Sequence, residues 1–144
     1  MRLTVDIIVL CKNKIVLIRR KKPPFMDCLV LPGGHVEDSD ANLAAACCRE
    51  LAEEIGLEVA PDQLRLLTVR DAKDRDPRPE RRVSIVFMVR FTELPSLIAG
   101  SDALEVEVVD LDSISQVIIG FDHYQAIMAA VMSENVSSSF DPKN

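Results

Sequence analysis

Three glutamates near the middle of the chain have the type and spacing expected of a metal-binding face. Glu50, Glu53 and Glu54 lie within the run 49–57, RELAEEIGL. On an α-helix, residues three and four positions apart share a face, so the three carboxylates would project together. Like charges this close repel, and a hard divalent cation such as Mg²⁺ or Mn²⁺ would neutralise them. The run predicts a divalent-metal site, with a merely solvated acidic helix face as the alternative.

This region resembles the Nudix box, G-x5-E-x7-R-E-U-x-E-E-x-G-U, in which U is aliphatic. The second half matches at every specified position from Arg49 to Leu57, and Gly33 and Gly34 stand where the box begins. Counting from Gly34, the acidic position falls on Asp40 rather than a glutamate, and Arg49 arrives one residue late. We interpret the stretch before Arg49 as one residue longer, which leaves the role of Asp40 open and the metal face intact.

Further segments resemble the ADP-ribose pyrophosphatase branch of this family. They are 74–78 (DRDPR), 99–103 (AGSDA), 121–123 (FDH) and 19–25 (RRKKPPF), and Ser101 stands where the branch more often has Asp. The resemblance implies Mg²⁺-dependent hydrolysis, with Mn²⁺ as the alternative metal, of a nucleoside diphosphate linked to another moiety. ADP-ribose, cleaved to AMP and ribose 5-phosphate, is the leading expectation.

Two alternatives to this activity remain open. One is a Nudix pyrophosphohydrolase that cleaves (deoxy)nucleoside triphosphates, and the other is a non-catalytic Nudix domain that senses a nucleotide. Nudix sensors often lose box carboxylates, whereas Glu50, Glu53 and Glu54 are all present here.

The resemblance also implies roles for the residues of the metal face. Glu50, Glu53 and Glu54, helped by a backbone carbonyl at Gly33, would bind the metal, which would activate water and stabilise the leaving phosphate. Arg49 would pair with a carboxylate and so orient the metal face.

Residues outside the helix complete the predicted site. Arg75 and Arg78 lie in a loop between predicted strands, where a guanidinium fork could hold a phosphate or a ribose, and internal ion pairs are the alternative. Arg19 and Gly34 are further predicted substrate-binding residues. Glu105 is the candidate general base, with an exposed charge at a strand end as its alternative. The only two histidines are both interpreted as structural, His35 beside the glycines and His123 at the start of a helix.

Composition limits the class of protein. The chain has 144 residues, 48% of them hydrophobic, which suits one globular domain, and its net charge of −6 argues against a nucleic-acid partner. Four cysteines without metal-ligand spacing favour a reduced, cytoplasmic protein. The start of the chain lacks the charge order of a signal peptide, and no apolar run approaches the roughly 18 residues of a membrane span. Because related enzymes are often dimers, a homodimer is also expected.

Hydrophobic periodicity and turn residues predict the elements that position these side chains. Strands are expected at 3–11, 14–20, 27–31, 64–70, 83–91 and 105–110, a glycine turn at 32–34, and helices at 41–55 and 121–132. Asp40 is the predicted N-cap of the first helix and Gly56 its stop. The pattern favours an α/β fold of the Nudix type, an α/β/α sandwich with a mixed sheet. We expect a single domain over 1–133 and a flexible C-terminal tail over 134–144.

Overall fold

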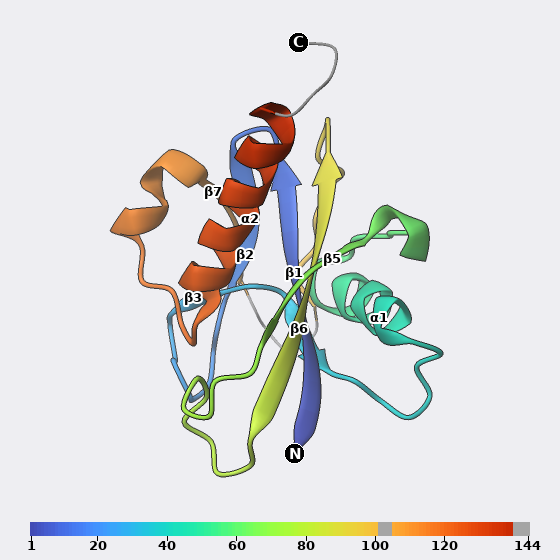
Figure 1. The fold of residues 1–144 in the computed structure, drawn as a ribbon, viewed down its shortest axis with the longest axis vertical. Coiled ribbons are helices and arrows are strands. Elements are labelled where there is room, and N and C mark those ends of the chain that lie inside the picture. The colour runs from blue at the N-terminus through green and yellow to red at the C-terminus, as the bar shows by residue number, and fades with distance from the viewer. Residues whose placement is uncertain (101–104, 140–144) are drawn as a thin grey trace.

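The computed structural model describes residues 1–100 and 105–139. A twisted sheet lies between two helices, one on each face (Figure 1). The strands are β1 (Arg2–Cys11), β2 (Lys14–Arg19), β3 (Leu29–Val30), β4 (Gly33–His35), β5 (Arg65–Arg70), β6 (Arg82–Phe91) and β7 (Glu105–Asp110). The helices are α1 (Leu43–Ile55), α2 (His123–Ser139) and the short 3-10 turns η1 (Pro61–Gln63) and η2 (Leu111–Gln116).

The sheet is mixed, as the sequence predicted. Its main path runs β3-β2-β1-β6-β5, with β4 paired to β1 and β7 paired to β2. β1 and β6 are parallel, whereas the other pairings between these strands are antiparallel. β1 is therefore the central strand, and it joins the parallel and antiparallel parts of the sheet.

The alternation of side chains along β1 builds two apolar layers. Val5, Ile7 and Val9 pack on the α1 side, and Ile8 and Leu10 pack on the α2 side. Because successive side chains of a strand point to opposite faces, a strand covered on both faces reads as a nearly continuous apolar run. This arrangement confirms the predicted α/β/α sandwich.

The first helix begins two residues later than predicted. The N-cap is Asn42, whose side-chain oxygen accepts a hydrogen bond of 2.8 Å from the N–H of Ala45. The prediction that Asp40 caps the helix is wrong, because the Asp40 carboxylate is engaged by Arg49 instead. Gly56 ends the helix as expected, in the left-handed conformation with φ of 65°.

Gly33 and Gly34 belong to strand β4 rather than to the predicted turn. Gly34 pairs with Val5 and Gly33 with Asp6 across an antiparallel ladder. A Cβ on Gly33 would overlap the carbonyl oxygen of Val5, and one on Gly34 would overlap the carboxylate of Glu50. These glycines therefore allow close approach of chain segments, not a special backbone conformation.

The closing helix extends further than the sequence suggested. α2 reaches Ser139, so the first part of the predicted tail is helical. Glu134 accepts hydrogen bonds from Arg65 on β5 at 2.8 Å and from Arg90 on β6 at 3.0 Å, which tie the helix to the sheet. The remainder of the predicted tail, 140–144, lies outside the described residues.

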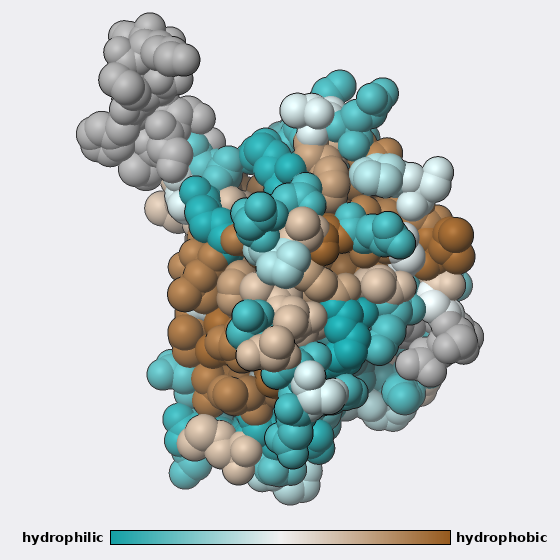
Figure 2. Space-filling view, turned by 90° about the vertical axis from the view of Figure 1, so that its right-hand side faces the viewer, coloured by the Kyte–Doolittle hydropathy of each residue, from teal (hydrophilic) through white to brown (hydrophobic). Residues whose placement is uncertain are grey.

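The face that carries α1 has polar and apolar surface side by side (Figure 2). On the edge strand β5, the residues Leu66 and Val69 are 59% and 48% exposed. Within the described residues, no helix combines the length and apolar character needed to cross a membrane.

Candidate active site

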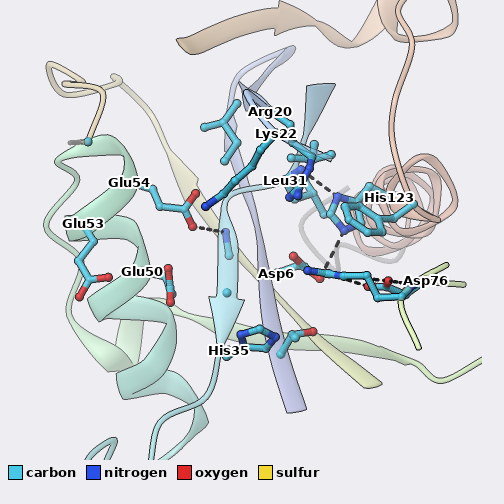
Figure 3. A pocket seen from close by; sticks show the side chains of 18 of the residues that line it. Asp6, Arg20, Lys22, Leu31, His35, Glu50, Glu53, Glu54, Asp76 and His123 are labelled. Atoms are coloured by element: carbon cyan, nitrogen blue, oxygen red, sulfur yellow. Dashed lines mark hydrogen bonds and ion pairs between the residues drawn. The ribbon is translucent and has the colours of Figure 1, made fainter. Parts of the chain in front are cut away.

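A cavity of about 660 Å³ opens over β4, between α1 and the start of α2. Carboxylates of α1 lie on one side of it, and His123, Asp6 and Asp76 lie on the other (Figure 3). Arg20 and Lys22, which follow the end of β2, lie at a third side. The cavity therefore has an acidic wall facing a wall of mixed charge.

The acidic wall holds the three predicted metal ligands. Glu50 is buried, whereas the side chain of Glu53 is 59% exposed. Glu54 accepts a 3.0 Å hydrogen bond from the backbone N–H of Gly33. The structure thus brings Glu50, Glu53 and Glu54 to the cavity, together with Gly33 and Gly34.

Arg49 organises this wall through a network of charge-assisted hydrogen bonds. Its Nε and Nη2 donate to the two carboxylate oxygens of Asp40 at 2.9 and 2.8 Å, and its Nη1 donates to Glu50 at 2.9 Å. Nη2 also donates to the carbonyl oxygen of His35. The hydrogen bond from Arg49, with one from the N–H of Glu37, lowers the pKa of Asp40 to about 2. Asp40 thereby anchors the arginine that holds Glu50.

The electrostatics of Glu50 and Glu54 favour a cation. Burial, and then the hydrogen bond and the charge of Glu50, raise the pKa of Glu54 to about 9. A divalent cation bound at this place would relieve the same repulsion. As the side chains stand, no group of three or more Asp, Glu, His or Cys residues among the described ones converges on a metal position. The carboxylate oxygens of the buried Glu50 and the partly buried Glu54 nevertheless fit a hard cation.

The two predicted substrate-binding arginines of the loop both line the cavity, but their environments differ. Arg75 is buried, and its Nε and Nη2 donate to the Asp122 carboxylate at 3.1 and 2.8 Å. Arg70 donates to the same carboxylate at 2.9 Å. The side chain of Arg78 is 32% exposed and forks onto Asp76 at 3.0 and 2.7 Å. Arg75 therefore anchors the loop to the start of α2, whereas Arg78 faces the cavity.

Two other predicted site residues do not line the cavity. Arg19 donates to Glu107 at 2.8 Å and to the carbonyl oxygen of Asp27 at 2.6 Å. Glu105 accepts a hydrogen bond of 2.9 Å from Lys21, and this bond and charge lower the pKa of Glu105. Lys21 itself lines the cavity, so Glu105 stands behind a lining residue.

Sequence reasoning missed a buried polar network on the side opposite α1. The N–H of Leu31 donates to Nδ1 of His123 at 3.0 Å, which leaves the ring proton on Nε2, 3.5 Å from an oxygen of Asp6. Ser84 donates to the same oxygen of Asp6. The one signal of this network in the sequence was Asp6, an acidic residue within an otherwise apolar strand. Its partners lie 78 and more residues away along the chain, so no local pattern could reveal them.

Known proteins share this fold and sequence. A curated protein of Methanocaldococcus jannaschii named ADP-ribose pyrophosphatase is 42% identical over 123 residues, which are 85% of this chain and 69% of that protein. A solved structure from Francisella tularensis, a bifunctional NMN adenylyltransferase/ADP ribose pyrophosphatase complexed with AMP and a Mn ion, has a TM-score of 0.82 and 32% identity. The match covers 92% of this chain but only 41% of the Francisella chain.

A second solved structure is similar over nearly its whole length. The NUDIX domain of Shewanella oneidensis NrtR, complexed with ADP ribose, has a TM-score of 0.83 and 25% identity, and the match covers 92% of this chain and 88% of that one. The model of the family described as NUDIX domain matches residues 1–130. With the acidic helix, the glycines and the fold all in agreement, this chain belongs to the Nudix family.

Proposed function

We propose that this chain hydrolyses ADP-ribose to AMP and ribose 5-phosphate with a divalent metal, Mg²⁺ by expectation and Mn²⁺ as the alternative. The observation that carries the proposal is the cavity itself, in which the carboxylates of Glu50 and Glu54 share one space with the cations Arg20, Lys22 and Arg78. A metal-bound diphosphate needs carboxylates to bind the metal and basic side chains to bind the phosphate oxygens. The 42% identical relative, whose name is ADP-ribose pyrophosphatase, supports the choice of substrate.

The residues of α1 would hold the metal. We assign Glu50, Glu53 and Glu54 as ligands, with the carbonyl of Gly33. A bound divalent cation supplies positive charge to the diphosphate and lowers the pKa of water. Arg49 keeps the Glu50 carboxylate in place, and the N–H of Gly33 keeps that of Glu54 in place. This preorganisation saves the cost of ordering the ligands during the reaction.

The basic side chains would bind the rest of the substrate. The net charge of the chain is −6, so a local group of cations is needed to attract a polyanionic ligand. The Nε and Nη2 of Arg78 donate to Asp76. Each further charge-assisted hydrogen bond from Arg78 to a phosphate or ribose of the substrate would contribute about 1.5–3 kcal/mol to binding. Gly34 lines the cavity and, as proposed from the sequence, would contact the substrate there.

The general base remains a proposal. Glu105 is the candidate from the sequence, but a catalytic base works best with a pKa near the operating pH, and Lys21 lowers that of Glu105. A carboxylate of the box is the alternative. Replacing Glu105 by Gln decides between them.

Three proposals concern the protein as a whole. We expect a cytoplasmic protein that binds no nucleic acid and forms a homodimer. The exposed apolar side chains on the edge strand β5 support self-association. Light scattering after size-exclusion chromatography tests the oligomeric state. A monomer at all concentrations would contradict the proposed homodimer.

A domain that senses ADP-ribose without hydrolysing it is the second candidate. The NUDIX domain of the Shewanella protein is similar over most of this chain and was solved with ADP ribose bound. A sensor binds the ligand without consuming it. Conversion of the ligand to products therefore separates the two functions.

The test is a substrate panel in the presence of Mg²⁺, with every product identified. ADP-ribose, other nucleoside diphosphate sugars, dinucleotides and nucleoside triphosphates should be compared by kcat/KM. We expect ADP-ribose to be the best substrate and to yield AMP and ribose 5-phosphate. A preference for triphosphates would favour the first alternative, and tight binding of ADP-ribose without turnover would favour the sensor.

A further inference from the structure

A segment of the connection that follows β6 is bound through its backbone to the C-terminal end of α1. The N–H of Ile98 donates to the carbonyl oxygen of Ile55, and the N–H of Gly100 donates to that of Glu54, both at 2.9 Å. Leu97 packs against the apolar core that α1 shares. We call residues 97–100 the latch. Gly100 also lines the cavity, so the latch reaches the candidate active site.

The fit of the latch against α1 requires glycine at position 100. A Cβ on Gly100 would overlap the backbone carbonyl oxygen of Glu53, and the backbone of a helix cannot move aside as the end of a flexible side chain can. The neighbouring residues are different, since Ala99 is exposed and Ile98 is 70% exposed. The contact with the end of the helix therefore depends mainly on backbone atoms of the latch.

The last turn of α1 is electrostatically unfavourable by itself. It carries Glu53 and Glu54, two of the three proposed metal ligands, and it contains no basic residue. Carbonyl groups at the end of a helix lack intrahelical partners and make that end partly negative, which disfavours nearby carboxylates. The N–H of Gly56 satisfies the carbonyl oxygen of Ala52, and the latch satisfies those of Glu54 and Ile55. The latch therefore orders a turn that would otherwise tend to fray.

We propose that Gly100 is a positioning residue for the metal site, acting through the latch on the last turn of α1. This inference rests on the proposed function, because it takes Glu53 and Glu54 as ligands of a divalent cation. When the latch orders the turn, the two carboxylates are already held for the cation, and binding no longer includes the cost of ordering them. Such coupling is reciprocal, so a bound cation should also stabilise the latch.

Amide hydrogen exchange of the wild-type protein, with and without Mg²⁺, tests the coupling without any substitution. We expect Mg²⁺ to slow exchange of the Ile98 and Gly100 amides by about tenfold. The reference is the amide of Leu111, which donates to the carbonyl oxygen of Asn13 at 2.9 Å in a place where neither residue lines the cavity. Its exchange should change by less than about twofold. Unchanged exchange in the latch, or equal slowing at Leu111, would refute the coupling.

Gly100→Ala and Ala99→Ser provide a matched pair of variants, because each adds a single non-hydrogen atom to the latch. Calorimetric titration with Mn²⁺, without nucleotide, measures metal binding directly. We expect Gly100→Ala to raise the Mn²⁺ dissociation constant by about tenfold, since the two backbone hydrogen bonds of the latch are weakened. Ala99→Ser should change it by less than about twofold, because the residue is exposed.

Rates of ADP-ribose hydrolysis by the same variants separate positioning of the metal from binding of the substrate. In Gly100→Ala the Mg²⁺ concentration for half-maximal activity should rise by about tenfold, whereas KM for ADP-ribose at saturating Mg²⁺ should stay within about twofold of wild type. Wild-type Mn²⁺ affinity in Gly100→Ala, an equal loss in Ala99→Ser, or a rise confined to KM would each overturn the inference. Should Gly100→Ala fail to fold, the exchange experiment on the wild-type protein still decides.

Failure of this inference can be distinguished from failure of the proposed function. If the wild-type protein does not hydrolyse ADP-ribose, but Mg²⁺ protects the latch amides and Gly100→Ala weakens Mn²⁺ binding, the activity is wrong and the role of Gly100 stands. If the wild-type protein hydrolyses ADP-ribose and Gly100→Ala keeps both its Mn²⁺ affinity and its Mg²⁺ requirement, the role of Gly100 alone is wrong.

Discussion

Replacing Arg75 by Ala should destabilise the fold more than it changes recognition of the substrate. The side chain of Arg75 is 4% exposed and that of its partner Asp122 is 12% exposed. Removing one member of a buried ion pair costs about 3–5 kcal/mol. Because Asp122 keeps its hydrogen bond to Arg70, we expect a loss of about 2–3 kcal/mol. For a chain of this length each kcal/mol lowers Tm by about 3–4 °C, so Tm should fall by about 6–12 °C.

The contrast with Arg78 makes this test specific. The Arg78 side chain is partly exposed, and its partner Asp76 is two residues away, so Arg78→Ala should cost less than about 1 kcal/mol. Arg78→Ala should instead raise KM for ADP-ribose. Arg81→Ala, an exposed change in the same loop, is the control.

Thermal unfolding followed by circular dichroism, and initial rates measured well below Tm, give both quantities for each variant. The reasoning is refuted if Arg75→Ala keeps the wild-type Tm and loses kcat/KM for ADP-ribose as strongly as Arg78→Ala. Arg75 would then bind substrate, as the sequence alone suggested.

Three further predictions concern the glycine strand, the Asp40 anchor and the candidate base. Gly34→Ala should lower kcat by about a hundredfold, because its Cβ would displace the Glu50 carboxylate, and a rate within twofold of wild type would contradict the close packing. In the Asp40→Asn variant, Tm should fall less steeply with decreasing pH than in the wild-type protein. The folded pKa of Asp40, about 2, lies below its ordinary 3.8, so its contribution is complete above about pH 4 and lost as the pH falls towards 2. Thermal unfolding between pH 5 and 2 checks this, and equal slopes in both proteins would refute it. Glu105→Gln should lower kcat by about two to four orders of magnitude if Glu105 is the base. An unchanged kcat would indicate that a carboxylate of the Nudix box is the general base instead.

The sequence was sufficient where the signal is local. The spacing of Glu50, Glu53 and Glu54 placed them on one helix, and the helix exists with Gly56 as its C-terminal cap. Runs rich in Val, Ile and Leu predicted the strands on both sides of it. These inferences succeed because helix and strand periodicities depend on neighbouring residues in the chain.

The sequence was insufficient where partners are far apart in the chain. For Arg75 the sequence left substrate binding and an internal ion pair both open, since nothing nearby indicated that Asp122, 47 residues later, would engage it. The contact between Phe25 and Phe121 depends on two loops that meet only in the folded protein. Asp40 was misread because an N-cap and an ion-pair partner call for the same residue type, and the choice depends on where Arg49 points.

The most direct test of the central claim is product formation from ADP-ribose by wild-type, Glu54→Gln and Glu58→Gln proteins, with and without Mg²⁺. Glu58 is exposed and does not line the cavity, so it is the matched control. We predict AMP and ribose 5-phosphate in equal amounts from the wild-type and control proteins, only with the metal present. Glu54→Gln should be slower by at least about a hundredfold, a loss near 2.7 kcal/mol in the transition state, and should remain folded. Metal-independent cleavage, or near-normal turnover by Glu54→Gln at limiting Mg²⁺, would contradict the account.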